Sequence, residues 1–302
     1  MPPLLNYDSA PAIRRFLDER GLGMRKRYGQ NFLINPSARK KLLDALDLPP
    51  GEAVWEIGPG LGAMTAGLLE RGGRVRAFEV DRGFAEALSL IFRGERNFVL
   101  VYGDVLKTWR GEEGAAYLAG NLPYNIAALL LADFIEGGRF FKRMVVTVQK
   151  ETAGRMLAKP GSRDYSSFSV LCASAYTISP VITLKGASFY PEPRVESQGL
   201  RLDLRTDVDP AAYPPLFRVL VRGLFAARRK TVKNNLGAFL GRMFPRERAG
   251  EQAEEILASC GIAPRKRAED LALDDFTALT RALEPAFPGA AASSPERKDR
   301  SW

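Results

Sequence analysis

Between residues 53 and 148 the sequence alternates short apolar runs with segments of helical spacing, and this alternation allows few folds. Strand patterns fall at residues 53–57, 74–80, 97–102, 116–120 and 144–148. Helical patterns fall between them, at residues 65–70, 84–92 and 126–134. This order predicts an α/β fold with a doubly wound, mostly parallel sheet that helices cover on both faces.

The regions on either side of this segment predict further parts. Residues 11–20 have helical spacing, and Asn35 followed by Pro36 predicts the capped start of another helix. Residues 207–215, rich in Pro and Asp, predict a linker, and helical spacing returns at residues 216–226, 251–259 and 271–283. We therefore expect a catalytic domain with a basic N-terminal extension (1–206), a helical domain (207–284) and a disordered tail (285–302).

The composition excludes several kinds of chemistry. The chain contains no histidine, which excludes Ser-His-Asp and Cys-His nucleophile pairs and zinc sites built on histidine. Its two cysteines, Cys172 and Cys260, lie far apart and predict reduced thiols. We expect no metal and no membrane span. Because the N-terminus also lacks a signal-peptide pattern, we expect a cytoplasmic protein.

Charge is distributed unevenly along the chain. Residues 31–138 carry 11 basic and 14 acidic side chains, whereas the two flanks together carry a net +12. This uneven charge would be explained if the two basic flanks bind a polyanion. A solvated basic surface is the alternative. Arg228, Arg229, Lys230 and Lys233 form a basic cluster on a predicted helix, and residues 265–267 form another. Both could contact nucleic-acid phosphates.

A glycine-rich turn, Gly58-Pro59-Gly60-Leu61-Gly62, follows the first predicted strand. Glycines allow left-handed conformations and a close approach of backbone to ligand, and a turn between strand and helix is a common nucleotide site. Glu79 ends the second strand and could accept hydrogen bonds from ribose hydroxyls, while Asp104 follows the third and could accept from an adenine amine. Exposed strand ends are the alternative, and the spacing alone leaves both NAD and S-adenosylmethionine open.

The turn Asn121-Leu122-Pro123-Tyr124 follows the fourth predicted strand and suggests the second reactant. An exocyclic adenine amine is a poor nucleophile because its lone pair is delocalised into the ring. The Asn121 side-chain oxygen and the Leu122 carbonyl could accept both N–H bonds, Pro123 fixes the turn, and Tyr124 could stack on the base. These features favour methyl transfer from S-adenosylmethionine by positioning and electrostatics.

Several ordered motifs resemble those of the S-adenosylmethionine-dependent rRNA adenine N6,N6-dimethyltransferases. They occupy residues 26–33, 56–61, 121–126, 148–151, 189–197 and 228–231, and the resemblance runs from about residue 13 to residue 283. It is closest to the bacterial small-subunit branch. The resemblance implies a Rossmann-like class I methyltransferase fold, with helical residues 207–284 binding RNA.

The resemblance also implies roles for individual residues. Those expected to hold the cofactor are Asn31, Leu33, Gly58, Gly60, Glu79, Asp104 and Asn121. Asn121 would also stand at the reacting amine, with Leu122, Pro123 and Tyr124 completing the catalytic turn. Phe189 would be a second aromatic facing the base opposite Tyr124, and a buried core phenylalanine is the alternative. The motif around Phe189 departs from the family pattern at Glu192, where a proline is usual.

The implied activity is dimethylation of two adjacent adenosines in the 3′-terminal hairpin of 16S rRNA, within a pre-30S particle and by a monomeric enzyme. One alternative is the large-subunit rRNA dimethyltransferase that confers macrolide resistance. Another is a non-catalytic assembly or transcription factor of the same fold, against which the intact Asn121, Pro123 and Tyr124 argue. A small-molecule methyltransferase would leave the basic flanks unexplained.

Overall fold

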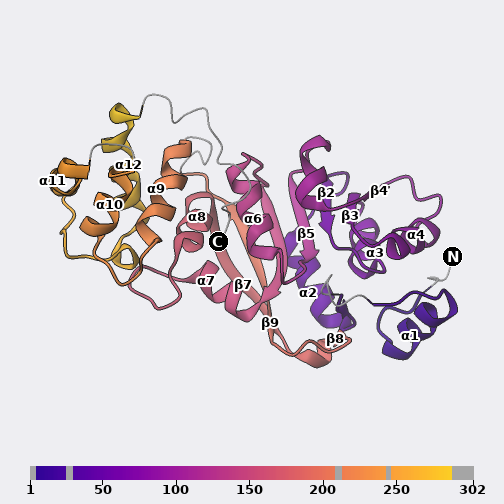
Figure 1. The fold of residues 1–302 in the computed structure, drawn as a ribbon. Coiled ribbons are helices and arrows are strands. Elements are labelled where there is room, and N and C mark those ends of the chain that lie inside the picture. Colours follow the sequence, from indigo (N-terminus) through magenta and orange to yellow (C-terminus); the bar gives the residue numbers. More distant parts are fainter. Residues whose placement is uncertain (1–4, 25–29, 208–212, 243–245, 288–302) are drawn as a thin grey trace. The chain divides into compact units, whose positions relative to one another are not determined.

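The fold is seen in a computed structural model that describes residues 5–24, 30–207, 213–242 and 246–287, without the side chains of 246–248 (Figure 1). Parts of three predicted features lie outside these residues. They are residues 26–29 of the motif at residues 26–33, residues 208–212 in the middle of the linker, and residues 288–302 of the tail.

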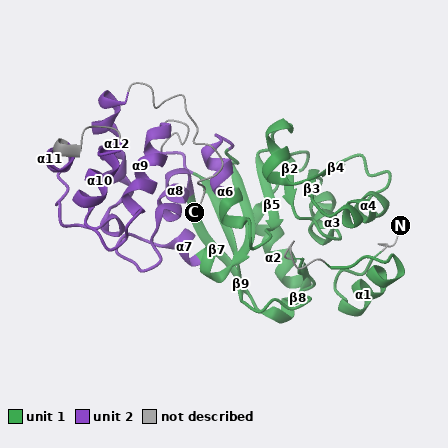
Figure 2. Ribbon diagram, viewed as in Figure 1, with its two compact units in different colours: residues 1–130, 140–153, 177–204 green, residues 131–139, 154–176, 205–302 purple. Residues whose placement is uncertain are grey.

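The chain divides into two compact units (Figure 2). Unit 1 comprises residues 1–130, 140–153 and 177–204, and unit 2 comprises residues 131–139, 154–176 and 205–302. The units interleave along the sequence, because the chain enters unit 2 twice before its last strands return to the sheet of unit 1. The predicted boundary at residue 206 therefore matches only the last of these crossings.

Unit 1 is built on a seven-stranded sheet with the order β4-β3-β2-β5-β6-β9-β7. Its strands are β2 (Ala53–Ile57), β3 (Arg74–Glu79), β4 (Phe98–Tyr102), β5 (Tyr117–Asn121), β6 (Arg143–Gln149), β7 (Tyr176–Leu184) and β9 (Ser197–Leu204). The first five are parallel and β9 runs antiparallel to β6. The predicted mostly parallel sheet is confirmed, and the five predicted strands are placed within one residue at each end.

Three parts of the strand pattern were not predicted, and β9 is one of them. β7 carries a proline and mixes exposed with half-buried side chains, so neither a buried run nor a clean alternation marks it. A separate two-stranded sheet joins β1 (Phe32–Leu33) to β8 (Phe189–Tyr190), with Leu33 opposite Phe189. Two-residue strands this far apart in sequence have no local signature.

Helices flank the sheet. Those of unit 1 are α1 (Ala10–Glu19), α2 (Pro36–Leu46), α3 (Ala63–Glu70), α4 (Arg82–Ile91), α5 (Val105–Thr108), and the 3₁₀ turns η2 (Trp109–Gly111) and η3 (Gly186–Ser188). α6 (Ala127–Glu136) and α7 (Lys150–Leu157) have residues in both units. The predicted cap of α2 is confirmed, since Asn35 Oδ1 accepts from the Ala38 N–H at 2.9 Å.

The sheet is held by a buried apolar layer. The Trp55 ring on β2 is 1 % exposed and packs edge-on against Phe78 and Phe141, with ring centroids 4.9 and 5.5 Å away. Its indole N–H donates to the Glu113 carbonyl at 3.0 Å, so the polar end of the side chain is satisfied. Each fully buried large apolar side chain contributes about 1.5–3 kcal/mol, so this layer holds the carboxyl ends of the strands at fixed positions.

Unit 2 is helical in its carboxyl-terminal part. Its helices are α8 (Ser167–Ala175), α9 (Pro215–Phe225), α10 (Val232–Leu240), α11 (Arg246–Ser259) and α12 (Leu273–Leu283), with 3₁₀ turns η5 (Ala268–Asp270) and η6 (Glu284–Ala286). Apolar faces of these helices share one core that includes Leu220, Leu236 and Phe276. The three predicted helices are confirmed as α9, α11 and α12.

Two predictions for this part of the chain need correction. The tail does not begin at residue 285, because residues 284–286 form η6 and Phe287 packs against the core of unit 2. The basic residues Arg228, Arg229 and Lys230 are not helical: they lie in a turn after α9. The Thr231 side chain caps α10 by accepting from the Asn234 N–H, so that helix begins only at Val232.

Cys172 and Cys260 are both free thiols, as predicted. Among the described residues, no helix is long and apolar enough to cross a membrane.

Candidate active site

A cavity of about 280 Å³ opens at the carboxyl ends of the parallel strands of unit 1. The order of the strands reverses between β2 and β5, and ligands of doubly wound sheets bind at such a reversal. The cavity is lined by Asn31, Leu33, Gly58, Gly60, Glu79, Asp104, Asn121 and Pro123 among the residues that the sequence singled out. Leu122, Tyr124 and Phe189 are not on its wall.

The glycine turn leaves bare backbone along one wall of the cavity. Gly58 and Gly60 have φ values of +67° and +60°, which L-residues with a Cβ rarely adopt. A Cβ on Gly60 would stand 3.1 Å from the Phe32 ring, and one on Gly58 would stand 3.6 Å from the Asn121 carbonyl oxygen. The positive φ values therefore favour glycine at both positions, the space beside Gly60 is also tight, and the bare backbone lets a ligand approach closely.

Glu79 ends β3 with a buried carboxylate, 6 % exposed. Its Oε1 accepts from the Asp81 N–H at 2.8 Å. Burial raises the pKa of Glu79 to about 7, although backbone hydrogen bonds from Asp81 and Gly60 oppose the rise. A carboxylate that loses this much solvation is favourably paired with ligand hydroxyl groups, and its contact with a ribose stays a prediction.

Asp104 begins α5 at the next strand end. Its Oδ1 accepts from the Leu106 N–H at 3.1 Å and so caps the helix. No described residue donates to its Oδ2, and the side chain is half-buried on the cavity wall. This oxygen is therefore available to an amine of a ligand.

Asn121, the last residue of β5, has a carboxamide of fixed orientation. Its Nδ2 donates to the Asn31 carbonyl oxygen at 2.8 Å, which turns Oδ1 the other way. That Oδ1 is buried and accepts no hydrogen bond from any described residue. Since a buried oxygen without a donor costs about 1–3 kcal/mol, this arrangement suits a ligand that brings an N–H group.

The rest of the turn is fixed by backbone contacts. The Leu122 N–H donates to the Thr147 carbonyl at 3.0 Å, which joins the turn to β6. The Pro123 carbonyl accepts from the N–H groups of Ile126 and Ala127, both at 3.0 Å, and so starts α6. The Leu122 carbonyl accepts from no described residue. Its oxygen is the second acceptor that the sequence predicts for the amine.

Phe189 lies in the apolar core of unit 1. Its side chain is 1 % exposed and belongs to the same buried cluster as Leu33 and Leu184. The cavity does not reach it. This placement supports the alternative, a core phenylalanine, and gives no support to a ring that faces the target base.

Glu56 is the first residue of the motif at residues 56–61, and no role was predicted for it. It lies beneath the glycine turn, 2 % exposed, and lines the cavity. The Thr65 hydroxyl donates to its Oε2 at 2.6 Å, which ties α3 to β2. Burial raises the pKa of Glu56 to about 7, and the nearby charge of Glu79 adds to the rise. A charged residue inside an otherwise apolar strand was the signal that could have revealed it.

Glu56→Gln should flatten the dependence of stability on pH. In the folded protein the pKa of Glu56 is about 7 against a normal 4.5, so the folded state binds the proton more tightly. Its contribution is fully present below pH 4.5 and is lost as pH rises through 7, by up to about 3 kcal/mol. Urea unfolding at pH 5.5 and 8 should show a smaller difference for the variant than for the wild type. Glu52→Gln, at an exposed site, is the control, and equal differences in all three proteins would contradict the expectation.

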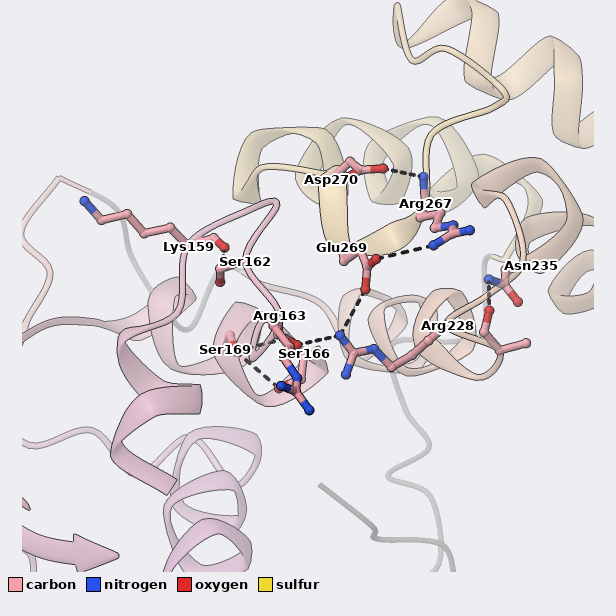
Figure 3. A network of polar contacts seen from close by, with 11 residues as sticks. Lys159, Ser162, Arg163, Ser166, Ser169, Arg228, Asn235, Arg267, Glu269 and Asp270 are labelled. Atoms are coloured by element: carbon pink, nitrogen blue, oxygen red, sulfur yellow. Dashed lines mark hydrogen bonds and ion pairs between the residues drawn. The ribbon is translucent and has the colours of Figure 1, made fainter. Parts of the chain in front are cut away.

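The structure places the basic clusters in unit 2 and shows that three of their cations are paired. Arg267, in the second cluster, pairs with Glu269 at 3.8 Å. The Arg228 guanidinium bonds to the Arg163 carbonyl at 2.7 Å and to Glu269 at 2.9 Å, joining three segments (Figure 3). Lys233 pairs with Glu254 at 2.8 Å. Arg229 and Lys230 are exposed and form no ion pair with any described residue. They are the members of this cluster that are available to phosphates.

Residues 21–283 match the family model for ribosomal RNA adenine dimethylases. The chain is 45% identical to ribosomal RNA small subunit methyltransferase A of Treponema pallidum over 281 residues, which cover 92% of this chain and 97% of that protein.

Two solved structures share the fold. A dimethyladenosine transferase from Plasmodium falciparum has a TM-score of 0.70 at 25% identity, with 85% of this chain and 97% of that chain covered. The 23S rRNA methyltransferase ErmE has a TM-score of 0.60 at 23% identity, with 84% and 100% covered, and supports the fold alone. With a family model matching most of its length, the chain belongs to the ribosomal RNA adenine dimethylase family.

Proposed function

We propose that this protein transfers methyl groups from S-adenosylmethionine to N6 of two adjacent adenosines in the 3′-terminal hairpin of small-subunit rRNA. The observation that carries the proposal is the Asn121 carboxamide. Its nitrogen donates to the Asn31 carbonyl, and its oxygen is buried and accepts from no described residue. Asn121 lines the cavity. An adenine amine supplies the missing N–H.

S-adenosylmethionine is the family's cofactor and supplies an electrophilic methyl group on a sulfonium. The cavity suits it, because acidic acceptors stand at two strand ends beside a bare glycine backbone. Glu79 would accept from the ribose hydroxyls and Asp104 from the adenine amine. The turn at Gly58 and Gly60 would run along the methionine portion. Asn31, Leu33 and Asn121 would complete the contacts.

The base to be methylated would lie against the Asn121–Tyr124 turn. Asn121 Oδ1 and the Leu122 carbonyl would accept the two N–H bonds of the amine, so that its lone pair points at the methyl group. Tyr124 would stack on the ring, worth about 1–3 kcal/mol. A paired adenine must leave its stack to reach this position, at a cost of a few kcal/mol. Catalysis is then positioning and electrostatics, without an imidazole base.

The choice of the small subunit rests on the relatives. The Treponema pallidum protein, named for the small subunit, is 45% identical across nearly the whole chain, whereas the 23S enzyme is 23% identical. We propose that the protein acts in the cytoplasm as a monomer, on a pre-30S particle and without a metal. The large-subunit enzyme and a non-catalytic assembly factor remain alternatives that the experiment below separates.

Exposed cations of unit 2 should contribute to rRNA binding through phosphates. We expect the double variant Arg229→Ala/Lys230→Ala to bind rRNA more weakly and to reduce the slope of log affinity against log salt by about 1–2. Binding measured between 50 and 200 mM salt checks this. Arg242→Ala/Arg281→Ala removes two other exposed cations of the same unit and is the control. A slope unchanged from wild type would remove Arg229 and Lys230 from the interface.

The test of the proposed function is mass spectrometry of rRNA from cells that lack the protein. Dimethyladenosine should be missing from the 3′-terminal hairpin of the small-subunit rRNA and restored by the wild-type chain. Loss from large-subunit rRNA would favour the resistance-type enzyme. Unchanged dimethyladenosine in both rRNAs would favour a non-catalytic factor.

A further inference from the structure

One contact of the catalytic turn is made by a residue to which no role has been assigned. The Tyr124 hydroxyl and the Ser197 hydroxyl are 2.6 Å apart, and either can donate the hydrogen bond. Ser197 is the first residue of β9 and is completely buried, while Tyr124 is half-buried. The two residues are 73 positions apart in the sequence, so only the tertiary structure brings them together.

The register of the sheet explains the contact. Asn121 on β5 lies opposite Thr147 on β6, and Gln149, two residues further on, lies opposite Ser197 on β9. Residues paired in register point to the same face of a sheet, as do residues two apart on one strand. The side chains of Asn121 and Ser197 therefore share a face. Tyr124, three residues after Asn121, lies on that face with its hydroxyl at Ser197.

Ser197 is a rigid support. It stands at the end of the antiparallel ladder between β6 and β9, paired with Gln149. The carbonyl of its neighbour Glu196 accepts a hydrogen bond from the Lys150 N–H at 3.0 Å. The side chains of Glu196 and Lys150 also form an ion pair at 2.6 Å. The exposed ion pair is worth little by itself, but the ladder and the backbone bond fix the position of the serine hydroxyl.

The Tyr124 hydroxyl needs this partner. Burial raises the pKa of Tyr124, so its hydroxyl is protonated at neutral pH and can donate to Ser197. The hydroxyl lies on the long axis of the tyrosine ring, so a hydrogen bond there fixes the position of the far end of the ring. Removing either hydroxyl would leave the other without this partner and the far end of the ring free to shift.

We propose that Ser197 is a positioning residue that holds the far end of the Tyr124 ring in place for stacking on the target adenine. The proposal rests on the proposed role of the Asn121–Tyr124 turn. Ser197 does not line the cavity and acts through Tyr124 alone. Its loss should therefore slow methyl transfer without weakening the binding of S-adenosylmethionine.

The experiment is a double-mutant cycle on Ser197→Ala and Tyr124→Phe, each of which deletes one hydroxyl and keeps the rest of the side chain. The substrate is ribosomal particles of both subunits from cells lacking the protein, so methylation of either rRNA is detected. Single-turnover rates, S-adenosylmethionine affinity and thermal unfolding are measured for the wild type, both single variants and the double variant. Ser174→Ala is the control, because it deletes another buried serine hydroxyl, one bonded to the Leu171 carbonyl at 2.7 Å.

We expect each single variant to lower the methylation rate about tenfold, and the double variant to be no slower than the slower single variant. Affinity for S-adenosylmethionine should stay within twofold of wild type, and Ser174→Ala should methylate at the wild-type rate. If the rate losses of the two single variants multiply in the double variant, or if Ser197→Ala methylates at the wild-type rate, the role of Ser197 is overturned. The proposed function still stands in that case, provided that the wild type is active. If the wild type is inactive on both rRNAs, the proposed function and the role of Ser197 are both overturned, and non-additive changes in thermal unfolding would show that the hydrogen bond is only structural.

Discussion

Asn121→Ala should lower the rate of methyl transfer by at least about 10²–10³-fold while rRNA binding survives. Asn121 Oδ1 is a buried acceptor without a donor, held in place by the bond from Nδ2 to the Asn31 carbonyl at 2.8 Å. An acceptor fixed before the reaction can align the amine without reorganising, and removal of one such group costs rates of this order. Single-turnover methylation of small-subunit particles measures the effect.

Two further measurements separate a lost catalytic contact from a lost fold. rRNA affinity should match the wild type, because the cations expected to meet phosphates lie in unit 2, away from the turn in the sequence. The thermal midpoint should change little, since alanine removes an unsatisfied buried oxygen together with the hydrogen bond from Nδ2 to the Asn31 carbonyl. If the variant methylates at the wild-type rate, the role assigned to Asn121 is wrong.

Glu79→Ala should weaken binding of S-adenosylmethionine by about 10–100-fold. The carboxylate is buried at the end of β3, and one of its oxygens is fixed by the Asp81 N–H at 2.8 Å. Hydrogen bonds from ligand hydroxyls to a charged acceptor contribute about 1.5–3 kcal/mol, which gives the expected range. Calorimetric titration of the cofactor measures it, and unchanged affinity would count against the ribose site.

The same carboxylate should make cofactor binding depend on pH. The pKa of Glu79 is raised to about 7 by burial, so a growing fraction is protonated as pH falls below 7. Because ribose hydroxyls donate best to the ionised form, affinity should rise from pH 6 to pH 8 in the wild type. Glu79→Gln should remove most of this rise, whereas Glu56→Gln should leave it in place. If the affinity of Glu79→Gln still rises between pH 6 and pH 8, another group causes the pH dependence.

Much of the fold could be predicted from local patterns, and the reason is visible in particular elements. β2 is a buried strand bounded by turn residues, so its limits at residues 53 and 57 are encoded by its own sequence. β7, β9 and the pair β1 and β8 were missed because their pairing depends on residues distant in the chain. The helix expected at Arg228 begins only at Val232, since the Thr231 cap sets its start.

The sequence by itself determined the class of the sheet, the strand ends that carry Gly58, Glu79, Asp104 and Asn121, and the family resemblance, because alternation and short motifs are local properties. Only the tertiary structure decided how those side chains are used. The Asn121 nitrogen donates to the Asn31 carbonyl, which leaves the Asn121 oxygen without a donor. Phe189 is buried in the core, and the Tyr124 hydroxyl bonds to the Ser197 hydroxyl. The physical reason is that these hydrogen bonds join residues 73 and 90 positions apart. Such residues come into contact only when the strands pair in the folded sheet.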